Sequence, residues 1–147
     1  MSQYLDFISK NKLDNNYLSY AEHWFSPALK NVLLHQKGSS PFFLGINGAQ
    51  GSGKSTLAEW LKVTIESTSS LSVVIVSLDD FYLSKLARRT LAAEIHPLLK
   101  TRGVPGTHDL KHALAVFAAL KNGLPCKIPR LNKLLDDIAS QEEWQNI

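Results

Sequence analysis

The chain has 147 residues, enough for one modest domain, and 44% of them are hydrophobic, so a packed core is expected rather than disorder. A formal net charge of +3 and a pI of about 9.0 suit an anionic ligand without by themselves indicating nucleic acid. Cys126 is the only cysteine, which excludes an internal disulfide and a four-cysteine metal site.

Two further absences point to a cytoplasmic setting. The longest apolar runs, "LSVVIVSL" and "ALAVFAAL", are too short to span a membrane. The N-terminal "MSQYLDFISKNKLD" has no apolar core of the kind found in signal peptides. We therefore expect a cytoplasmic protein.

Apolar residues at helical spacing predict two helices between residues 4 and 37, with breaks near Asn15 and Pro27 and a loop at "KGSSP". The apolar runs "FFLGI" (42–46) and "LSVVIVSL" (71–78) predict short buried strands of the parallel kind. Between these strands, the pattern from Ser55 to Thr64 predicts a helix.

The second half of the chain is read from its turn residues and its periodicity. Residues 79–94 change from a loop to a helix, and the Pro- and Gly-rich stretch 96–109 predicts a long loop. A helix is expected from Asp109 to Asn122. Residues 124–133 are predicted to be extended, and the tail from Asp136 is polar.

The stretch from Gly48 to Ser55, "GAQGSGKS", satisfies the phosphate-loop pattern G-x-x-x-x-G-K-[ST] between a predicted strand and a predicted helix. Its glycines allow backbone angles closed to other residues, so that successive N–H groups and the helix N-terminus can surround an anion. Lys54 would reach the outer phosphates and Ser55 would ligate Mg²⁺. The alternative is a Gly-rich turn with a solvated lysine. The residues expected to bind the nucleotide are Gly48, Ala49, Gln50, Gly51, Ser52, Gly53, Lys54, Ser55 and Thr56.

The nucleotide is expected to be ATP, because the guanine signature N-K-x-D is absent and "NKLLD" is one residue too long. The second predicted strand delivers Asp79 and Asp80 at its C-terminal end, where open α/β sheets bind ligands. A carboxylate there could accept a proton from a substrate hydroxyl or hold Mg²⁺ through water. The alternative is an acidic turn or a helix cap.

Several motifs occur in an order that resembles the D-glycerate 3-kinase-like group of P-loop kinases, relatives of uridine kinase, pantothenate kinase and phosphoribulokinase. The motifs are "GINGAQGSGKSTLA", "SLDDFYL", "HPLLKTRGVPGTHDL" and "KIPRLNK". The resemblance covers most of the chain. It implies an α/β P-loop NTPase fold, Rossmann-like and three-layered, with a parallel sheet and N-terminal helices. Residues 1–147 would form one domain or its N-terminal half, with a helical lead-in (1–40) and a nucleotide-binding core with the acceptor loop (41–147).

The resemblance also assigns roles. Asp79, the first acid of its motif, would be the catalytic base and, with Ser55, a metal ligand, while Lys54 would serve catalysis at the phosphates. The loop 96–109 would close over the acceptor. A small hydroxy acid such as D-glycerate needs a cation at its carboxylate, and the planar fork of Arg102 is the candidate. The residues assigned to the acceptor are Asp80, Tyr82, Arg102, His108 and Asp109.

Structural alternatives stay open for several of these residues. Arg102 could be a solvated loop residue, and Asp109 could cap the next helix. His96 is interpreted as a turn residue, while the pair Arg88–Arg89 would be a solvated helix face or a phosphate-side pair. Lys127, Arg130 and Lys133 form a basic strip that is interpreted as exposed. The group usually has an aromatic residue where this chain has Leu131.

The resemblance implies a further strand ending in an acidic residue, followed by an arginine-bearing lid. The chain is therefore expected to be truncated at its C-terminus, or else another chain or a rearranged sheet fills the gap. In the family arrangement that strand lies between the two predicted here, which would otherwise lack ladder partners. We therefore expect self-association or marginal stability, and no useful phosphoryl transfer by these residues alone.

Two functions of different classes follow. The first is a small-molecule kinase, or its nucleotide-binding half, that uses ATP and Mg²⁺. The second is a non-catalytic nucleotide-binding module, or an inactive truncated kinase, that acts through a partner. A nucleic-acid ATPase is disfavoured because basic and aromatic residues are not interleaved, and no membrane partner is expected.

Overall fold

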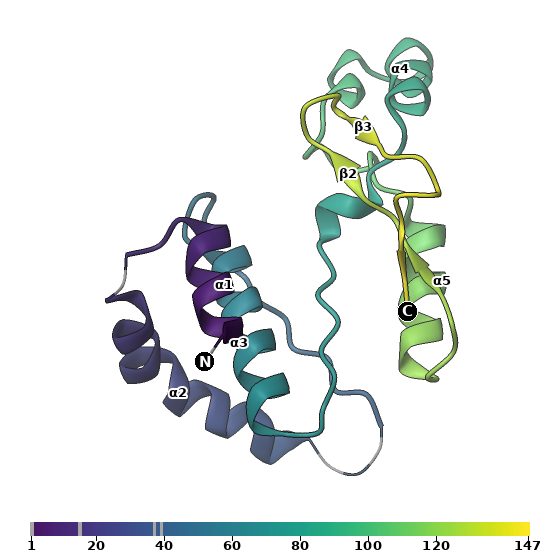
Figure 1. The fold of residues 1–147 in the computed structure, drawn as a ribbon. Helices are drawn as coiled ribbons and strands as arrows, with labels where there is room; N and C mark the ends of the chain where they lie inside the picture. The colour runs from purple at the N-terminus through teal and green to yellow at the C-terminus, as the bar shows by residue number, and fades with distance from the viewer. Residues whose placement is uncertain (1, 15, 37, 39) are drawn as a thin grey trace. The chain divides into compact units, whose positions relative to one another are not determined.

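The computed structural model describes residues 2–14, 16–36, 38 and 40–147. Its chain divides into two compact units, Met1–Ile75 and Val76–Ile147, whose elements can be followed by colour in Figure 1. The first unit holds α1 (Ser2–Asn11), α2 (Tyr17–His35) and α3 (Lys54–Thr68). The second holds η1 (Leu78–Phe81), α4 (Lys85–Glu94), η2 (Pro97–Lys100), α5 (Leu110–Lys121), β1 (Lys127–Ile128), β2 (Leu131–Asn132), β3 (Asp137–Ile138) and β4 (Gln145–Asn146).

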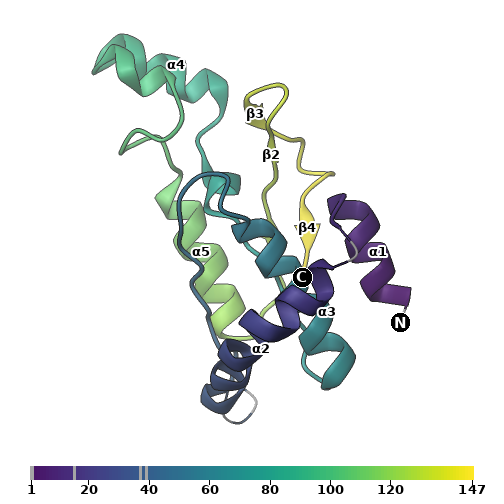
Figure 2. The ribbon, with the colours of Figure 1, turned by 90° about the vertical axis from the view of Figure 1, so that its left-hand side faces the viewer.

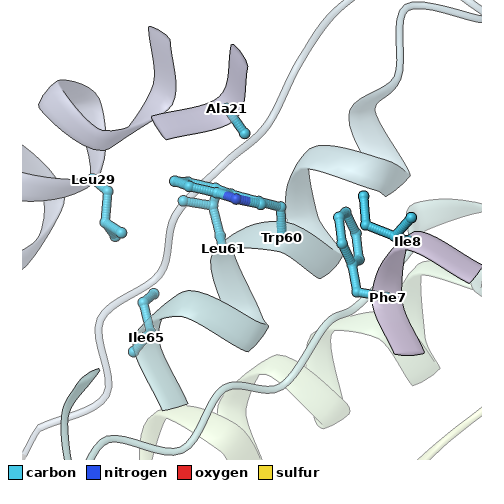
Figure 3. Packing of buried hydrophobic residues seen from close by; sticks show 7 residues of the cluster. All are labelled: Phe7, Ile8, Ala21, Leu29, Trp60, Leu61 and Ile65. Atoms are coloured by element: carbon cyan, nitrogen blue, oxygen red, sulfur yellow. The ribbon is translucent and has the colours of Figure 1, made fainter. Parts of the chain in front are cut away.

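The core of the first unit is built where the three helices meet. Trp60 of α3 is 1% exposed and lies among apolar side chains from the two other helices (Figure 3). The buried members of this core are Phe7, Ile8, Ala21, Leu29, Trp60, Leu61 and Ile65. Because α3 begins directly after the glycine-rich loop, the packing of α3 in this core fixes the position of the end of the loop.

The predicted helices of the first unit are present, with one correction. The expected break near Pro27 is wrong, because α2 continues through Pro27 from Tyr17 to His35. A proline inside a helix costs a hydrogen bond and a steric clash, but Ala21 and Leu29 bury both halves of α2 in one core. The expected break near Asn15 and part of the "KGSSP" loop lie outside the described residues.

The two predicted parallel strands have no ladder partners in the described part of the chain, so the parallel sheet is not confirmed. Residues 41–49 and 71–77 carry no strand assignment, and Leu78 begins η1. The predicted burial of "FFLGI" is wrong here, because Phe42 and Leu44 are 46% and 44% exposed. Backbone amides need a neighbouring chain to form a sheet, and within the described residues neither segment has one.

Side chains of α3 supply backbone partners at one point of the second segment. The Val73 N–H donates to Glu66 Oε1 at 2.8 Å, and Lys62 Nζ donates to the Val73 carbonyl. Lys62 and Glu66 also form an ion pair of 2.8 Å. Lys62 and Glu66 therefore provide hydrogen-bond partners for the N–H and the carbonyl of Val73, which in a sheet would pair with a neighbouring strand.

The second unit contains two short antiparallel pairs. β1 pairs with β4 with Ile128 opposite Gln145, and β2 pairs with β3 with Leu131 opposite Ile138. Figure 2 shows the β2–β3 hairpin from a second direction. The expected helix over 109–122 is confirmed as α5, which Asp109 and Asn122 flank as caps.

The loop expected over 96–109 contains the short helix η2 and is fastened to the chain near η1. The Leu83 N–H donates to the Thr107 carbonyl at 2.9 Å, and the Asp109 N–H donates to the Phe81 carbonyl at 2.7 Å. In the part of the chain that the structure describes, no helix is both long and apolar enough to cross a membrane.

Candidate functional site

The glycine-rich loop has the backbone that its sequence demands. Gly51 and Gly53 have φ angles of +76° and +83°, in the left-handed region that glycine enters without a steric penalty. At Gly48 an added Cβ would lie 2.9 Å from Ser52 Oγ, so a larger residue there would displace that hydroxyl. Gly51 and Gly53 are therefore favoured by their φ angles, and Gly48 by its close approach to Ser52.

The loop ends at an open helix N-terminus. Gly53 is the N-cap of α3 and gives it no side-chain cap, so the first amide groups of the helix keep their capacity to bind an anion. Lys54 is the first residue of α3, and its Nζ donates to the carbonyls of Gly48 at 2.9 Å and Ala49 at 2.7 Å. The Lys54 cation therefore lies on the loop itself.

The loop fits a nucleotide phosphate. It combines glycine backbone, uncapped amides and a cation, which are the groups that bind polyphosphates. The remaining predicted nucleotide residues are Ala49, Gln50, Ser52, Ser55 and Thr56, all in the loop or the first turn of α3. No group of three His, Cys, Asp or Glu side chains at metal-binding distance exists among the described residues. Mg²⁺ is usually held by phosphates, water and only one or two protein oxygens, and the Ser55 hydroxyl in the first turn of α3 is such an oxygen.

Asp79 and Asp80 are adjacent in η1 but have different environments. Asp79 is exposed, and its side chain has no hydrogen bond within the described residues. Asp80 is 7% exposed, accepts the Leu131 N–H at 2.8 Å and lies 3.6 Å from Arg130. Burial raises the pKa of Asp80, a shift that the Leu131 N–H and the Arg130 charge oppose and the neighbouring Asp79 charge reinforces. The carboxylate of Asp80 is therefore paired within the fold, whereas that of Asp79 has no hydrogen-bond partner in the described part of the chain.

A cavity of about 320 Å³ lies in the second unit, between η1, the start of α4, α5 and the strands that follow. Its lining includes three of the residues expected at the acceptor, Asp80, Tyr82 and Asp109. The sequence did not indicate His112 and Trp144 as site residues. Both line the cavity, and the centroids of their rings are 5.2 Å apart. Because Trp144 lies 32 residues after His112 in the chain, no local sequence pattern could indicate that the two rings are neighbours.

His108 and Arg102 both contact Tyr82, although neither lines the cavity. The His108 ring stacks on Tyr82 with centroids 4.0 Å apart, and an antiparallel bridge joins the two residues. The Arg102 guanidinium carbon lies 5.8 Å from the centre of the Tyr82 ring, within cation–π range. The structure thus brings together all five residues expected at the acceptor, either in the cavity lining or against Tyr82.

Three of the structural alternatives can be compared with the structure directly. The side chain of Asp109 caps α5 by accepting the His112 N–H at 2.9 Å, while also lining the cavity. His96 is a turn residue whose Nδ1 accepts the Leu98 N–H at 3.2 Å. The interpretation of Arg88 as part of a solvated helix face is wrong, because its side chain is fully buried, whereas Arg89 is exposed.

Arg88 and Arg102 meet at the carboxylate of Asp136, which the sequence places at the start of the polar tail. Asp136 Oδ2 lies 3.2 Å from Arg88 Nη2, and Asp136 Oδ1 accepts a hydrogen bond of 2.5 Å from Arg102 Nε. Burial raises the pKa of Asp136, but the hydrogen bonds and charges of the two arginines outweigh it and leave that pKa lowered. The separations of 48 and 34 residues explain why no local pattern indicated this cluster.

The lowered pKa of Asp136 predicts how the stability of the second unit depends on pH. A carboxyl group whose folded pKa lies below its unfolded value contributes stability above that value, and the contribution is lost as the pH falls through the folded pKa. The ordinary value is 3.8. We expect Asp136→Asn to be less stable than wild type at about pH 7, with the gap shrinking below about pH 4. Urea unfolding at several pH values measures this; a gap independent of pH would contradict it.

The comparisons with known proteins return kinases. No protein-family model matches the chain. The fission yeast protein "Uncharacterized kinase mug58" is 46% identical over 85 residues, which are 56% of this chain and 30% of that protein. The pantothenate kinase of Brevibacillus brevis is 29% identical over 144 residues, which are 96% of this chain and 42% of that protein.

Two solved structures share the fold. The D-glycerate 3-kinase of Cryptococcus neoformans superposes with a TM-score of 0.63 at 23% identity, over 91% of this chain and 49% of that one. The YGR205w protein superposes with a TM-score of 0.61 at 23% identity, over 90% and 48%. The chain therefore spans less than half the length of these proteins. Sequence relatives named as kinases and a shared P-loop kinase fold confirm the resemblance to the D-glycerate 3-kinase-like group.

Proposed function

We propose that this chain carries the nucleotide-binding part and the acceptor cavity of a small-molecule kinase. The reaction would move the γ-phosphate of ATP to a hydroxyl of a small metabolite, with D-glycerate as the first candidate acceptor. The observation that carries the proposal is the glycine-rich loop, with its positive φ angles, the uncapped start of α3 and Lys54. The kinase relatives support it.

Each part of the loop would have its own role. The amides that follow Gly51 and Gly53 would bind phosphate oxygens, and Lys54 would exchange its two carbonyl partners for the outer phosphates. The Ser55 hydroxyl would hold Mg²⁺, which would neutralise charge on the transferred group. Thr56 would add a hydroxyl close to the inner phosphate.

The second unit would supply the acceptor chemistry. The exposed carboxylate of Asp79 would orient the attacking hydroxyl and take its proton, and would also contribute to holding the metal. The cavity lined by Asp80, Tyr82 and Asp109 would hold the body of the acceptor. A cytoplasmic location, self-association and the lack of a nucleic-acid partner remain predictions.

The proposal predicts that Lys54→Ala weakens ATP binding by tenfold or more. One lost charge-assisted contact is worth about 1.4 kcal/mol or above, and tenfold in affinity corresponds to that free energy. Isothermal titration calorimetry with Mg²⁺ and ATP measures the change. Lys111→Ala is a matched control, because Lys111 is an exposed lysine in the first turn of another helix, α5. Equal ATP affinity in wild type and Lys54→Ala would remove the role assigned to Lys54.

A further inference from the structure

Asp136 holds two arginines that come from different parts of the second unit. Arg88 belongs to α4, and Arg102 follows η2 in the loop expected at the acceptor. Asp136 itself has a φ of +54°, in the left-handed region that non-glycine residues rarely occupy. Both oxygens of the Asp136 carboxylate are paired, and its backbone is strained. Asp136 therefore joins two chain segments and is not a solvated acid of the tail.

The two arginines are engaged to different degrees. The side chain of Arg88 is fully buried, and its three nitrogens donate to the carbonyls of Leu83, Lys100 and Asp136 as well as to the Asp136 carboxylate. Arg88 therefore has little left to offer a ligand. Its role is to fix α4, the end of η2 and the β2–β3 hairpin to one another.

Arg102, by contrast, is held through one nitrogen. Its Nε donates to Asp136, its side chain is 29% exposed, and its terminal amino groups have no hydrogen bond in the part of the chain described. The guanidinium lies 5.8 Å from the Tyr82 ring, which lines the cavity. An arginine anchored at Nε keeps the two-pronged end that matches a carboxylate.

We infer that Asp136 is a positioning residue that holds Arg102 by Nε, so that the terminal amino groups of Arg102 bind the carboxylate of an anionic acceptor beside Tyr82. This inference rests on the proposed kinase function and adds to it a residue that positions the arginine assigned to the acceptor carboxylate. The benefit is preorganisation, because a guanidinium already fixed at one end loses less freedom when it binds.

Two effects of Asp136 on an anionic ligand oppose each other. Its negative charge repels a second carboxylate, whereas its hydrogen bond fixes the Arg102 fork. If charge dominated, Asp136→Asn would strengthen the binding of a hydroxy acid. If positioning dominates, as we infer, Asp136→Asn weakens it, because the amide bonds the guanidinium less strongly than the carboxylate does. The sign of the change therefore tests the inference.

The experiment compares D-glycerate with glycerol, its neutral counterpart, by NMR titration of the 147-residue chain without nucleotide. Wild type is expected to bind D-glycerate more tightly than glycerol. Asp136→Asn and Arg102→Lys are each expected to weaken D-glycerate binding roughly tenfold and to leave glycerol binding unchanged. Asp137→Asn is the matched control, since it removes a neighbouring charge and keeps an oxygen for the Lys85 N–H. It is expected to bind D-glycerate as wild type does.

The inference would be overturned if Asp136→Asn bound D-glycerate more tightly than wild type, or if it lost as much affinity for glycerol as for D-glycerate. It would also be overturned if wild type preferred glycerol or bound neither compound. If Asp136→Asn does not fold, Arg102→Lys decides, because it leaves the pair between Arg88 and Asp136 intact. The proposed function is judged separately by the dependence of ATP binding on Lys54. Failure of one therefore does not imply failure of the other.

Discussion

Replacing Asp79 with asparagine, in a longer relative that carries the same "SLDDFYL" motif, is expected to lower turnover by roughly 10²-fold or more while ATP binding stays largely intact. Asp79 is exposed at the start of η1, and its carboxylate has no hydrogen bond within the described residues. Asparagine keeps the size of the side chain but cannot accept the proton of an acceptor hydroxyl.

Steady-state kinetics and calorimetry on the same preparation test this prediction. The expected pattern is a fall in kcat with an unchanged ATP dissociation constant, since the nucleotide is assigned to the glycine-rich loop. Retained ATP affinity in the variant also serves as the control for folding. Turnover equal to that of the parent enzyme would show that Asp79 is only a turn residue.

Arg88→Ala is expected to destabilise the second unit by about 2–5 kcal/mol, the usual cost of truncating a large buried side chain and leaving its hydrogen-bond acceptors unpaired. The variant leaves three carbonyls and one oxygen of Asp136 without the donor that satisfies them, and opens a cavity where a fully buried side chain stood. The unfolding is expected to include α4 and the β2–β3 hairpin together, because Arg88 bonds to both regions.

Urea unfolding followed by the Trp144 indole N–H resonance reports on this unit, since that group donates to the Ala139 carbonyl at 2.9 Å. Arg89→Ala provides the control, because Arg89 is the adjacent arginine of the same helix and is exposed. Its effect is expected within about 0.5 kcal/mol of zero. Similar losses in the two variants would mean that the hydrogen bonds of Arg88 contribute little to stability.

Local patterns predicted those parts of the molecule that depend on local chemistry. Glycines beside a lysine predicted a loop that leads directly into a helix, and Gly53 does precede α3; Asp109 and Asn122 marked the limits of α5 correctly. The predicted parallel sheet depends on hydrogen bonds between distant segments, and residues 42–46 and 71–77 have no such partners in the described chain. Apolar content alone indicates that a segment can be a strand, not that a neighbour exists.

The acceptor side could be predicted only in part, for a related reason. The residues expected to contact the acceptor follow strand and loop motifs, and they do gather at the cavity or against Tyr82. The sequence places Asp136 at the start of a polar tail, where Lys133 is the nearest positive charge along the chain. Its partners Arg88 and Arg102 become neighbours only through tertiary folding.

The hydrogen bonds of Arg88 also have a kinetic consequence for folding. They join residues separated by 5, 12 and 48 positions along the chain. Closing a loop costs more entropy as the loop lengthens, although the cost grows only logarithmically. The bonds to Leu83 and Lys100 can form while α4 and η2 assemble, whereas the bond to Asp136 must wait for the hairpin to arrive. The buried Arg88 cation thus gains its counter-charge only through the most distant of its contacts along the chain.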